Sequence, residues 1–319
     1  MSESGPGNTG DNWDRKILEK VALAAVQEQR RSRQWGIFFK LLMFIYLFAL
    51  LFIGMGWFVK KDGLPGKHTA LVEVRGVIAA GGAAGADNVM AGLQEAFKDK
   101  GTQGVILRIN SPGGSPVQAG YINDEIKRLR VKYPKIPFYA VVEDICASGG
   151  YYIAVAADKI YVDKASIVGS IGVLMDGFGF TGLMDKLGIE RRLLAAGENK
   201  GFLDPFSPIR DSQKEYAEKM LNDIHQQFIT VVRQGRGKRL KETPEIFSGL
   251  LWTGQKSIEL GLADALGGVD FVAREVIKSE DIVDFTVREN IAERVARKFG
   301  AAMAETLVRL GAVSNLNIR

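Results

Sequence analysis

A serine between a predicted strand and a predicted helix is the residue best placed for chemistry in this sequence. Ser148 stands in Ala-Ser-Gly-Gly-Tyr-Tyr-Ile-Ala, residues 147–154, where a strand pattern gives way to small residues and then to a helical pattern. Backbone N–H groups and the dipole at a helix start favour negative charge, which the oxyanion of an acyl transfer requires. A serine that only caps the helix is a commoner use of this position. This segment alone therefore leaves a nucleophile and an N-cap both open.

A second glycine-rich turn follows another predicted strand. Residues 105–115 run from a buried strand into Ser-Pro-Gly-Gly-Ser. Adjacent glycines adopt backbone angles closed to other residues and let a ligand approach the chain closely. If Ser148 is the nucleophile, we expect an N–H of Gly113 or Gly114 to bind the substrate carbonyl oxygen together with the N–H of Gly149. The alternative is a plain tight connection between a strand and a helix.

A serine nucleophile needs a base, and the sequence holds only two histidines. His68 lies in the segment before the first predicted strand and His225 lies in the middle of a predicted helix, so a Ser-His-Asp triad is not expected. A lysine can act instead where burial favours its neutral amine. Lys200 is the best candidate because its loop, residues 195–208, carries few charges and several phenylalanines. Most lysines are merely solvated, so this pattern alone does not assign the base.

Other chemistries fit less well. Cys146 is the single cysteine, has no histidine near it in the sequence and is expected to be an inert buried thiol. Residues 177–182 match the dinucleotide pattern G-x-G-x-x-G, but they lie in the middle of the domain and the following acidic residue, Glu198, comes too early. No group of His, Cys and carboxylates has metal-ligand spacing, so neither a metal nor a cofactor is expected. The net charge of +5 is scattered, which argues against nucleic acid as a partner.

Short β-branched runs alternate with helical periods from residue 70 onward, which predicts an α/β fold with a largely parallel sheet. A content of 46% hydrophobic and 25% charged residues is typical of globular proteins. The predicted strands are Leu71–Ile78, Gly104–Asn110, Phe138–Val142, Lys159–Val162 and Arg191–Leu194. The predicted helices are Asn88–Lys98, Gln118–Lys132, Gly149–Ala156 and Ser212–Arg233.

A membrane anchor is predicted near the N-terminus. Leu41–Val59 is a run of 19 residues without a charge, long enough as a helix to cross the hydrocarbon core of a bilayer. Trp35 and Trp57 are placed like interfacial anchors. Basic residues lie on both sides of the run, so they only mildly favour a cytoplasmic N-terminus.

Five motifs follow one another along the chain: NSPGGS at 110–115, ASGGYYIA at 147–154, IVGSIGV at 167–173, GENKGFLDPFSP at 197–208 and WTGQKSIELGLAD at 252–264. In this order they resemble the signal peptide peptidase A family of bacterial serine peptidases, family S49. The resemblance implies a Clp-protease/crotonase-like fold of stacked ββα units preceded by one transmembrane helix. It also implies that Ser148 is the nucleophile, that Lys200 is the general base, that Ser170 hydrogen-bonds the lysine amine, and that the glycines of the SPGG turn form part of the oxyanion hole.

The resemblance further implies an inner-membrane protein with a cytoplasmic N-terminus and an extracytoplasmic catalytic domain. We expect short hydrophobic peptides, such as remnant signal peptides, as substrates. A homo-oligomer is expected because one copy of the fold leaves apolar surface that tandem members cover with a second copy. A non-catalytic scaffold of the same fold is the main alternative, and an acyl-CoA enzyme is a weaker one.

The expected domain organisation has five parts. It comprises a cytoplasmic segment at 1–34, the anchor at 35–59, a linker at 60–69, the peptidase domain at 70–280, and a C-terminal amphipathic helix and tail at 281–319. The basic amphipathic pattern at 291–310 predicts packing on a neighbouring chain, on the core or on lipid headgroups.

Overall fold

The computed structural model describes residues 10–54 and 66–288. The chain divides into two units, one formed by Met1–Asp62 with Asn290–Arg319 and the other by Gly63–Glu289. The amphipathic helix expected at 291–310 and the last residues of the expected anchor, 55–59, lie outside the described residues.

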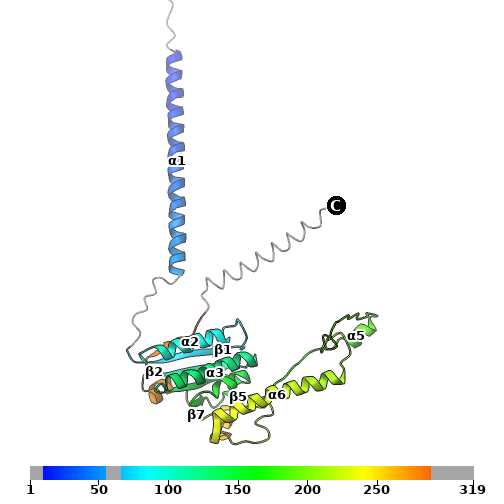
Figure 1. Ribbon diagram of the computed structural model, residues 1–319. Coiled ribbons are helices and arrows are strands. Elements are labelled where there is room, and N and C mark those ends of the chain that lie inside the picture. The colour runs from blue at the N-terminus through cyan, green and yellow to red at the C-terminus, as the bar shows by residue number, and fades with distance from the viewer. Residues whose placement is uncertain (1–9, 55–65, 289–319) are drawn as a thin grey trace, which may run out of the picture. The chain divides into compact units, whose positions relative to one another are not determined.

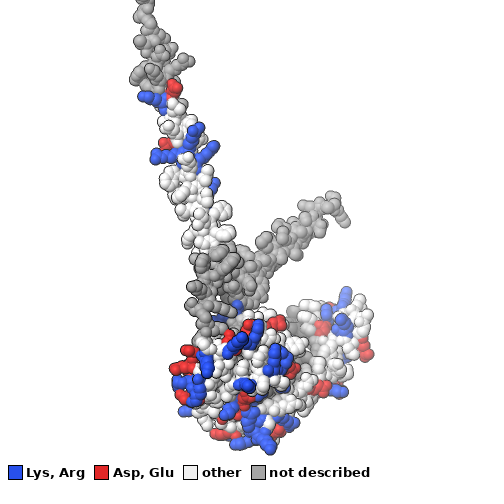
Figure 2. Space-filling model, turned by 60° about the vertical axis from the view of Figure 1, so that its left-hand side comes forward, with Lys and Arg blue, Asp and Glu red and all other residues white. Residues whose placement is uncertain are grey.

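The first unit contains one long helix, α1 (Gly10–Gly54). The segment Glu19–Leu50 within it is, by length and composition, long and apolar enough to cross a membrane, and it is the one such helix in the described ranges. Figure 2 shows a stretch of uncharged side chains along this helix beside a cluster of Lys and Arg. Trp35 packs against Phe38 and Phe39, with ring centroids 5.7 and 5.8 Å away. The predicted apolar helix is therefore present and forms a single element with the residues before it.

The second unit is built on one eight-stranded sheet (Figure 1). Its strands are β1 (His68–Arg75), β2 (Thr102–Ser111), β3 (Phe138–Ala147), β4 (Lys159–Val162), β5 (Ile167–Gly169), β6 (Leu251–Thr253), β7 (Ala265–Leu266) and β8 (Ile282–Asp284). The main path runs β6-β5-β3-β2-β1-β8, and β4 pairs with both β3 and β7. Every pairing is parallel except the antiparallel pairing of β5 with β6. The predicted α/β class with a largely parallel sheet is confirmed.

Helices and helical turns cover the sheet and carry its connections. They are α2 (Ala86–Lys98), α3 (Pro116–Lys132), α4 (Gly149–Ala154), α5 (Thr181–Lys186), α6 (Asp211–Arg236), η1 (Gly237–Arg239), α7 (Gly254–Glu259), α8 (Val269–Phe271) and η2 (Val272–Ile277). Successive strand side chains point to opposite faces. On β2, Leu107 joins the core shared with α2 and α3, while Ile106 joins a second cluster with Val272 of η2. The sheet is thus buried on both faces, which explains its continuous apolar runs.

Two local predictions need correction. His68, expected in a linker, lies in β1 and is fully buried, with Nε2 3.3 Å from the Thr102 Oγ1. Arg191–Leu194, predicted as a strand, forms no strand, and Leu194 is 96% exposed. This prediction is wrong because a strand needs a pairing partner, and Arg191–Leu194 has none among the described strands.

The segment between the β5 region and α6, residues 174–210, is called the arm below. Figure 1 shows α5, which lies within the arm, at the end of α6 that is away from the sheet. The other end of α6 is anchored in the core by Phe228, Val232 and Arg236. Helix α6 therefore connects the arm to the body of the sheet.

Candidate active site

Ser148 occupies a strained backbone position where β3 ends and α4 begins. Its φ is 50°, in a region that residues other than glycine rarely adopt. Its N–H donates to the carbonyl of Gly169 at 2.9 Å, and its carbonyl accepts from the N–H of Tyr152 at 2.9 Å. Its hydroxyl makes no capping hydrogen bond to α4. Ser148 is therefore the N-cap residue of α4 by position, but its side chain does not cap the helix, and the hydroxyl is left facing a cavity.

The Pro-Gly-Gly turn lies directly against Ser148. Gly113 has φ +101°, and a Cβ placed on it would come 2.7 Å from the Ser148 Cβ and 2.8 Å from the Gly149 nitrogen. Gly114 has φ +149°, and its backbone pairs with Ile78 in an isolated parallel bridge. Only glycine satisfies both the backbone angle and the close approach at Gly113. The turn is thus fitted to the serine rather than being a plain connection.

Two backbone N–H groups beside Ser148 have no acceptor among the described residues. The N–H of Gly113 is occupied, because it donates to Ser111 Oγ at 3.1 Å. The N–H groups of Gly114 and Gly149 have no acceptor in that part of the chain, and both residues line the cavity. A Cβ placed on Gly149 would lie 3.4 Å from the Gly114 nitrogen, so these two backbone segments are adjacent. Of the two glycines considered in the turn, Gly114 is the one with a free donor.

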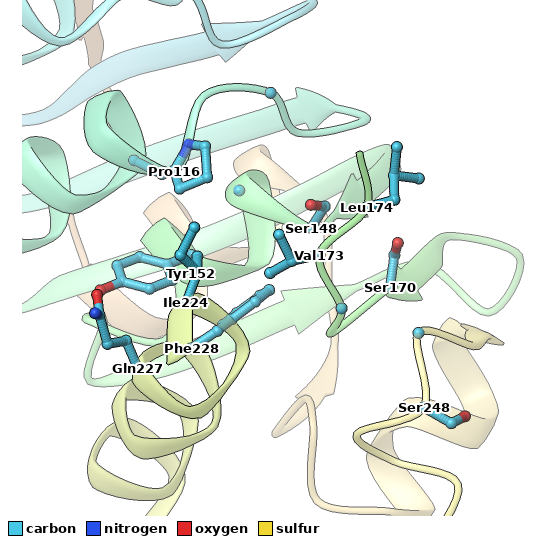
Figure 3. Close-up of a pocket in the computed structure, with 15 residues that line it drawn as sticks. Pro116, Ser148, Tyr152, Ser170, Val173, Leu174, Ile224, Gln227, Phe228 and Ser248 are labelled. Carbon is cyan, nitrogen blue, oxygen red and sulfur yellow. The ribbon is translucent and has the colours of Figure 1, made fainter. Parts of the chain in front are cut away.

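The cavity has a volume of about 530 Å³ and a mostly apolar wall (Figure 3). Its lining comprises Gly114, Pro116, Ala119, Ser148, Gly149, Tyr152, Ser170, Gly172, Val173, Leu174, Ile224, Gln227, Phe228, Ser248 and Gly249. None of these residues is a Lys, Arg, His, Asp or Glu, so the described residues place no conventional base in the cavity. Burial raises the pKa of Tyr152, which keeps this phenol protonated and unsuited to act as a base at neutral pH.

Ser170 lines the same cavity from the residue after β5. It also has a positive φ, 52°, and its N–H donates to the carbonyl of Leu250 at 2.8 Å. Ser148 is tied to the same segment through Gly169, the last residue of β5. The structure therefore brings Ser148, Ser170 and the free N–H groups of Gly114 and Gly149 to one cavity.

Lys200 is not part of this cavity. It lies in the arm, in a turn where its N–H donates to the carbonyl of Gly197 at 3.0 Å, and its side chain is exposed. The arm exposes many large apolar side chains: Leu174, Met175, Phe178, Leu183, Leu187, Ile189, Leu194 and Phe206. Such a surface on a projecting segment is typical of an interface with another chain.

The residues around the sequence motifs divide between the core and the arm. Tyr151 is fully buried, and its hydroxyl donates to the carbonyl of Leu262 at 2.8 Å, so it belongs to the core and not to the cavity. Phe178 and Phe202 lie in the arm and do not line the cavity. Cys146 is fully buried, and burial raises the pKa of its thiol, as expected for an inert cysteine.

The cavity wall formed by α6 was not predicted from the sequence. Ile224, Gln227 and Phe228 come from this helix, about 75 residues after Ser148 in the chain. The i, i+4 spacing of Ile224 and Phe228 places them on one helix face. That spacing indicates a buried helix face, but it does not indicate which part of the protein that helix face lines.

The sequence is similar to those of several known proteases. The sequence model of peptidase family S49 matches residues 130–282. A putative protease of Synechocystis is 31% identical over 201 residues, which cover 63% of this chain and 70% of that protein. A putative signal peptide peptidase SppA of Enterococcus faecium is 29% identical, with 72% of this chain and 68% of that protein covered.

A longer protein shares part of the chain at higher identity. The Na(+)/H(+) antiporter NhaA of Brucella abortus is 47% identical over 175 residues, which cover 55% of this chain and 24% of that protein. The chain thus spans about a quarter of that relative's length. The family match agrees with the serine, the glycine turn and the α/β sheet described above, and the apolar helix together with the SppA relative points to a membrane-anchored protein. The chain belongs to peptidase family S49.

Proposed function

We propose that this chain is a serine endopeptidase that cleaves short hydrophobic peptides, with Ser148 as the nucleophile and Lys200 of a neighbouring copy as the general base. The observation that carries the proposal is the composition of the cavity. A serine with an uncapped hydroxyl faces it beside two free N–H groups, while the described residues supply no base. Because the described residues complete the site except for its base, we assign the base to another chain.

The reaction follows from this arrangement. Ser148 Oγ attacks the substrate carbonyl carbon while its proton passes to the neutral lysine amine. The carbonyl oxygen becomes an oxyanion that accepts hydrogen bonds from the N–H groups of Gly114 and Gly149. The lysine then gives the proton to the leaving amine, and an acyl-enzyme ester forms on Ser148. Water, deprotonated by the same lysine, attacks the ester and releases the acid and the free serine.

Lys200 is proposed as the base because of where the arm carries it. The arm is joined to the sheet through α6 and exposes an apolar surface that a second copy would bury. Docking of arms onto neighbouring copies would bring Lys200 of one chain to Ser148 of the next in a closed homo-oligomer. An apolar cavity favours the neutral form of a lysine amine. The Ser170 hydroxyl is suited to hold that amine, because it faces the cavity and has no partner among the described residues.

The substrate class is proposed from the cavity wall. Pro116, Val173, Ile224 and Phe228 present apolar surface, and no charged side chain of the described residues lines the cavity. An apolar side chain next to the cleaved bond would bury its surface here, whereas a Lys or Asp would lose its hydration without a partner. Remnant signal peptides have this composition.

The proposed setting is the bacterial inner membrane. The apolar segment of α1 would cross the membrane once, with the N-terminus in the cytoplasm and the peptidase domain on the extracytoplasmic side. Remnant signal peptides lie in the same membrane, so an anchored peptidase would encounter its substrates by diffusion within the membrane plane.

Complementation between two inactive variants tests the shared site. Ser148→Ala and Lys200→Ala chains are purified separately in detergent, dissociated, mixed and reassembled. Each variant alone should be inactive, and the mixture should regain part of the wild-type activity because some neighbours supply both residues. A mixture shown to be hetero-oligomeric but inactive would place both residues in one chain. Wild-type protein that hydrolyses no peptide and does not react with a fluorophosphonate at Ser148 would instead support the non-catalytic scaffold.

A further inference from the structure

His225 of α6 hydrogen-bonds the backbone segment that carries Ser170. Its Nε2 lies 3.1 Å from the carbonyl oxygen of Ile171. Because a carbonyl oxygen can only accept, Nε2 must carry a hydrogen and donate it. The neutral ring protonated at Nε2 and the imidazolium both meet this requirement. The contact therefore joins α6 to the residue directly after Ser170.

The segment needs such support because its backbone is strained. Gly169 and Ser170 both have positive φ, 120° and 52°, and a serine rarely adopts this conformation. The conformation is held on one side by the hydrogen bond from the Ser170 N–H to the Leu250 carbonyl, 2.8 Å long. The Ile171 side chain is fully buried. His225 supplies the hydrogen bond from the side of α6.

His225 is separated from the cavity itself. Its neighbours Ile224, Gln227 and Phe228 line the cavity, whereas His225 does not. It is half-buried and oriented toward the backbone of Ile171 rather than toward the place of a substrate. The hydrogen bond of His225 reaches the site through the Ser170 segment.

We propose that His225 is a positioning residue that holds Ser170 in the conformation needed to orient the lysine base. The inference rests on the proposed function, in which Ser170 holds that amine. A displaced Ser170 hydroxyl would leave the base poorly aligned with Ser148 and would slow the acylation step. Substrate binding would be little affected, because the apolar wall of the cavity stays in place.

Two amide substitutions test the hydrogen bond at nearly constant polarity. The amide nitrogen of a glutamine can take the place of the histidine Nε2. The side chain of an asparagine is too short for its amide nitrogen to reach the Ile171 carbonyl. In the full chain in detergent, His225→Gln should keep kcat within about two-fold, and His225→Asn should lower kcat about ten-fold with KM nearly unchanged. Gln226→Asn is the matched control, since Gln226 is exposed and adjacent, and it should leave both constants unchanged. If His225→Asn does not fold, His225→Met takes its place as a variant of similar size without a donor.

Coupling to Ser170 distinguishes positioning from a general structural role. In a Ser170→Ala background the further loss from His225→Asn should disappear, because the hydroxyl it positions is already gone. The inference is overturned if the Asn and Gln variants have equal kcat, or if the ten-fold loss persists in the Ser170→Ala background. The proposed function has a separate readout: if Ser148→Ala leaves hydrolysis intact, that function fails, whereas a required Ser148 with unaffected His225 variants refutes only the positioning role.

Discussion

The N–H of Ser148 donates a 2.9 Å hydrogen bond to the carbonyl of Gly169, the residue directly before Ser170. The two cavity serines are thus linked through one backbone hydrogen bond between the residue after β3 and the last residue of β5. Both have positive φ, so both hydroxyls are presented by strained backbone. Strain of this kind persists only where the surrounding structure holds it, and here parallel strand pairing supplies that support.

Gly113→Ala should abolish most activity. The added Cβ would lie 2.7 Å from the Ser148 Cβ at a φ of +101°, so the turn or the serine must move. We expect a fall in kcat/KM of about 100-fold or more and weaker fluorophosphonate labelling of Ser148. Gly120→Ala is the control, because nothing lies within 4 Å of its added Cβ on helix α3, and it should leave labelling unchanged. If Gly113→Ala is labelled by the fluorophosphonate to the same extent as the wild type, the close fit of the turn is contradicted.

Ser148→Ala and Lys200→Ala should each abolish hydrolysis without unfolding the chain, and Ser170→Ala should reduce the rate less severely. Attack and proton transfer are both essential, whereas Ser170 only orients the base. A lysine accepts a proton only in its neutral form. The kcat/KM of the wild type should therefore rise as pH increases from about 6 to about 9. A rate that falls steadily between neutral and mildly alkaline pH would rule out a neutral lysine as the base.

Gln227→Glu should broaden specificity toward basic side chains. Gln227 lines the cavity, and this substitution adds a negative charge with almost no change in shape. The wild type should cleave after apolar residues and discriminate against Lys and Arg. In the variant, the ratio of kcat/KM for apolar residues to that for Lys and Arg should fall about ten-fold. Gln226→Glu adds the same charge one residue away, outside the cavity lining, and should have no such effect. Equal profiles for the two variants in a peptide library would show that Gln227 does not contact the substrate side chain.

Asp264→Asn should destabilise the peptidase unit. Asp264 accepts hydrogen bonds from Arg236 at 2.8 and 3.0 Å, and from the Ile160 N–H at 2.7 Å. Arg236 is only 1% exposed, so loss of the carboxylate leaves a buried guanidinium without its counter-charge. The expected cost is about 3 kcal/mol of unfolding free energy near neutral pH, measured by urea denaturation.

The Asp264 effect should depend on pH with a defined sign. Burial acts to raise the pKa of Asp264, but the hydrogen bonds and charge of Arg236 outweigh it, so the pKa lies below its ordinary value. A lowered carboxyl pKa stabilises the folded state above the unfolded pKa of about 4, and this stabilisation is lost as pH falls through the folded pKa. The gap between wild type and Asp264→Asn should therefore shrink below about pH 4. If the difference in unfolding free energy stays constant down to about pH 3, the ion pair does not cause it.

The sequence by itself determined the features that depend on residues close together in the chain. Alternating strand and helix patterns predicted the α/β sheet, because side-chain periodicity depends on near neighbours in the chain. The two glycine-rich turns identified Ser148 and the Gly113–Gly114 pair, since strained turns have few compatible residues. The apolar run in α1 was equally plain, because length and composition alone define a membrane-spanning candidate.

Only the tertiary structure decided how these parts meet. It showed that the Ser148 side chain does not cap α4, identified Gly114 as the glycine of the turn with a free N–H, and placed Ile224 and Phe228 of α6 in the cavity wall. It also showed that Lys200 lies in the arm, outside the cavity of its own chain. These facts depend on contacts between segments far apart in the sequence, and the spacing of residues along a chain does not encode which of its faces will meet.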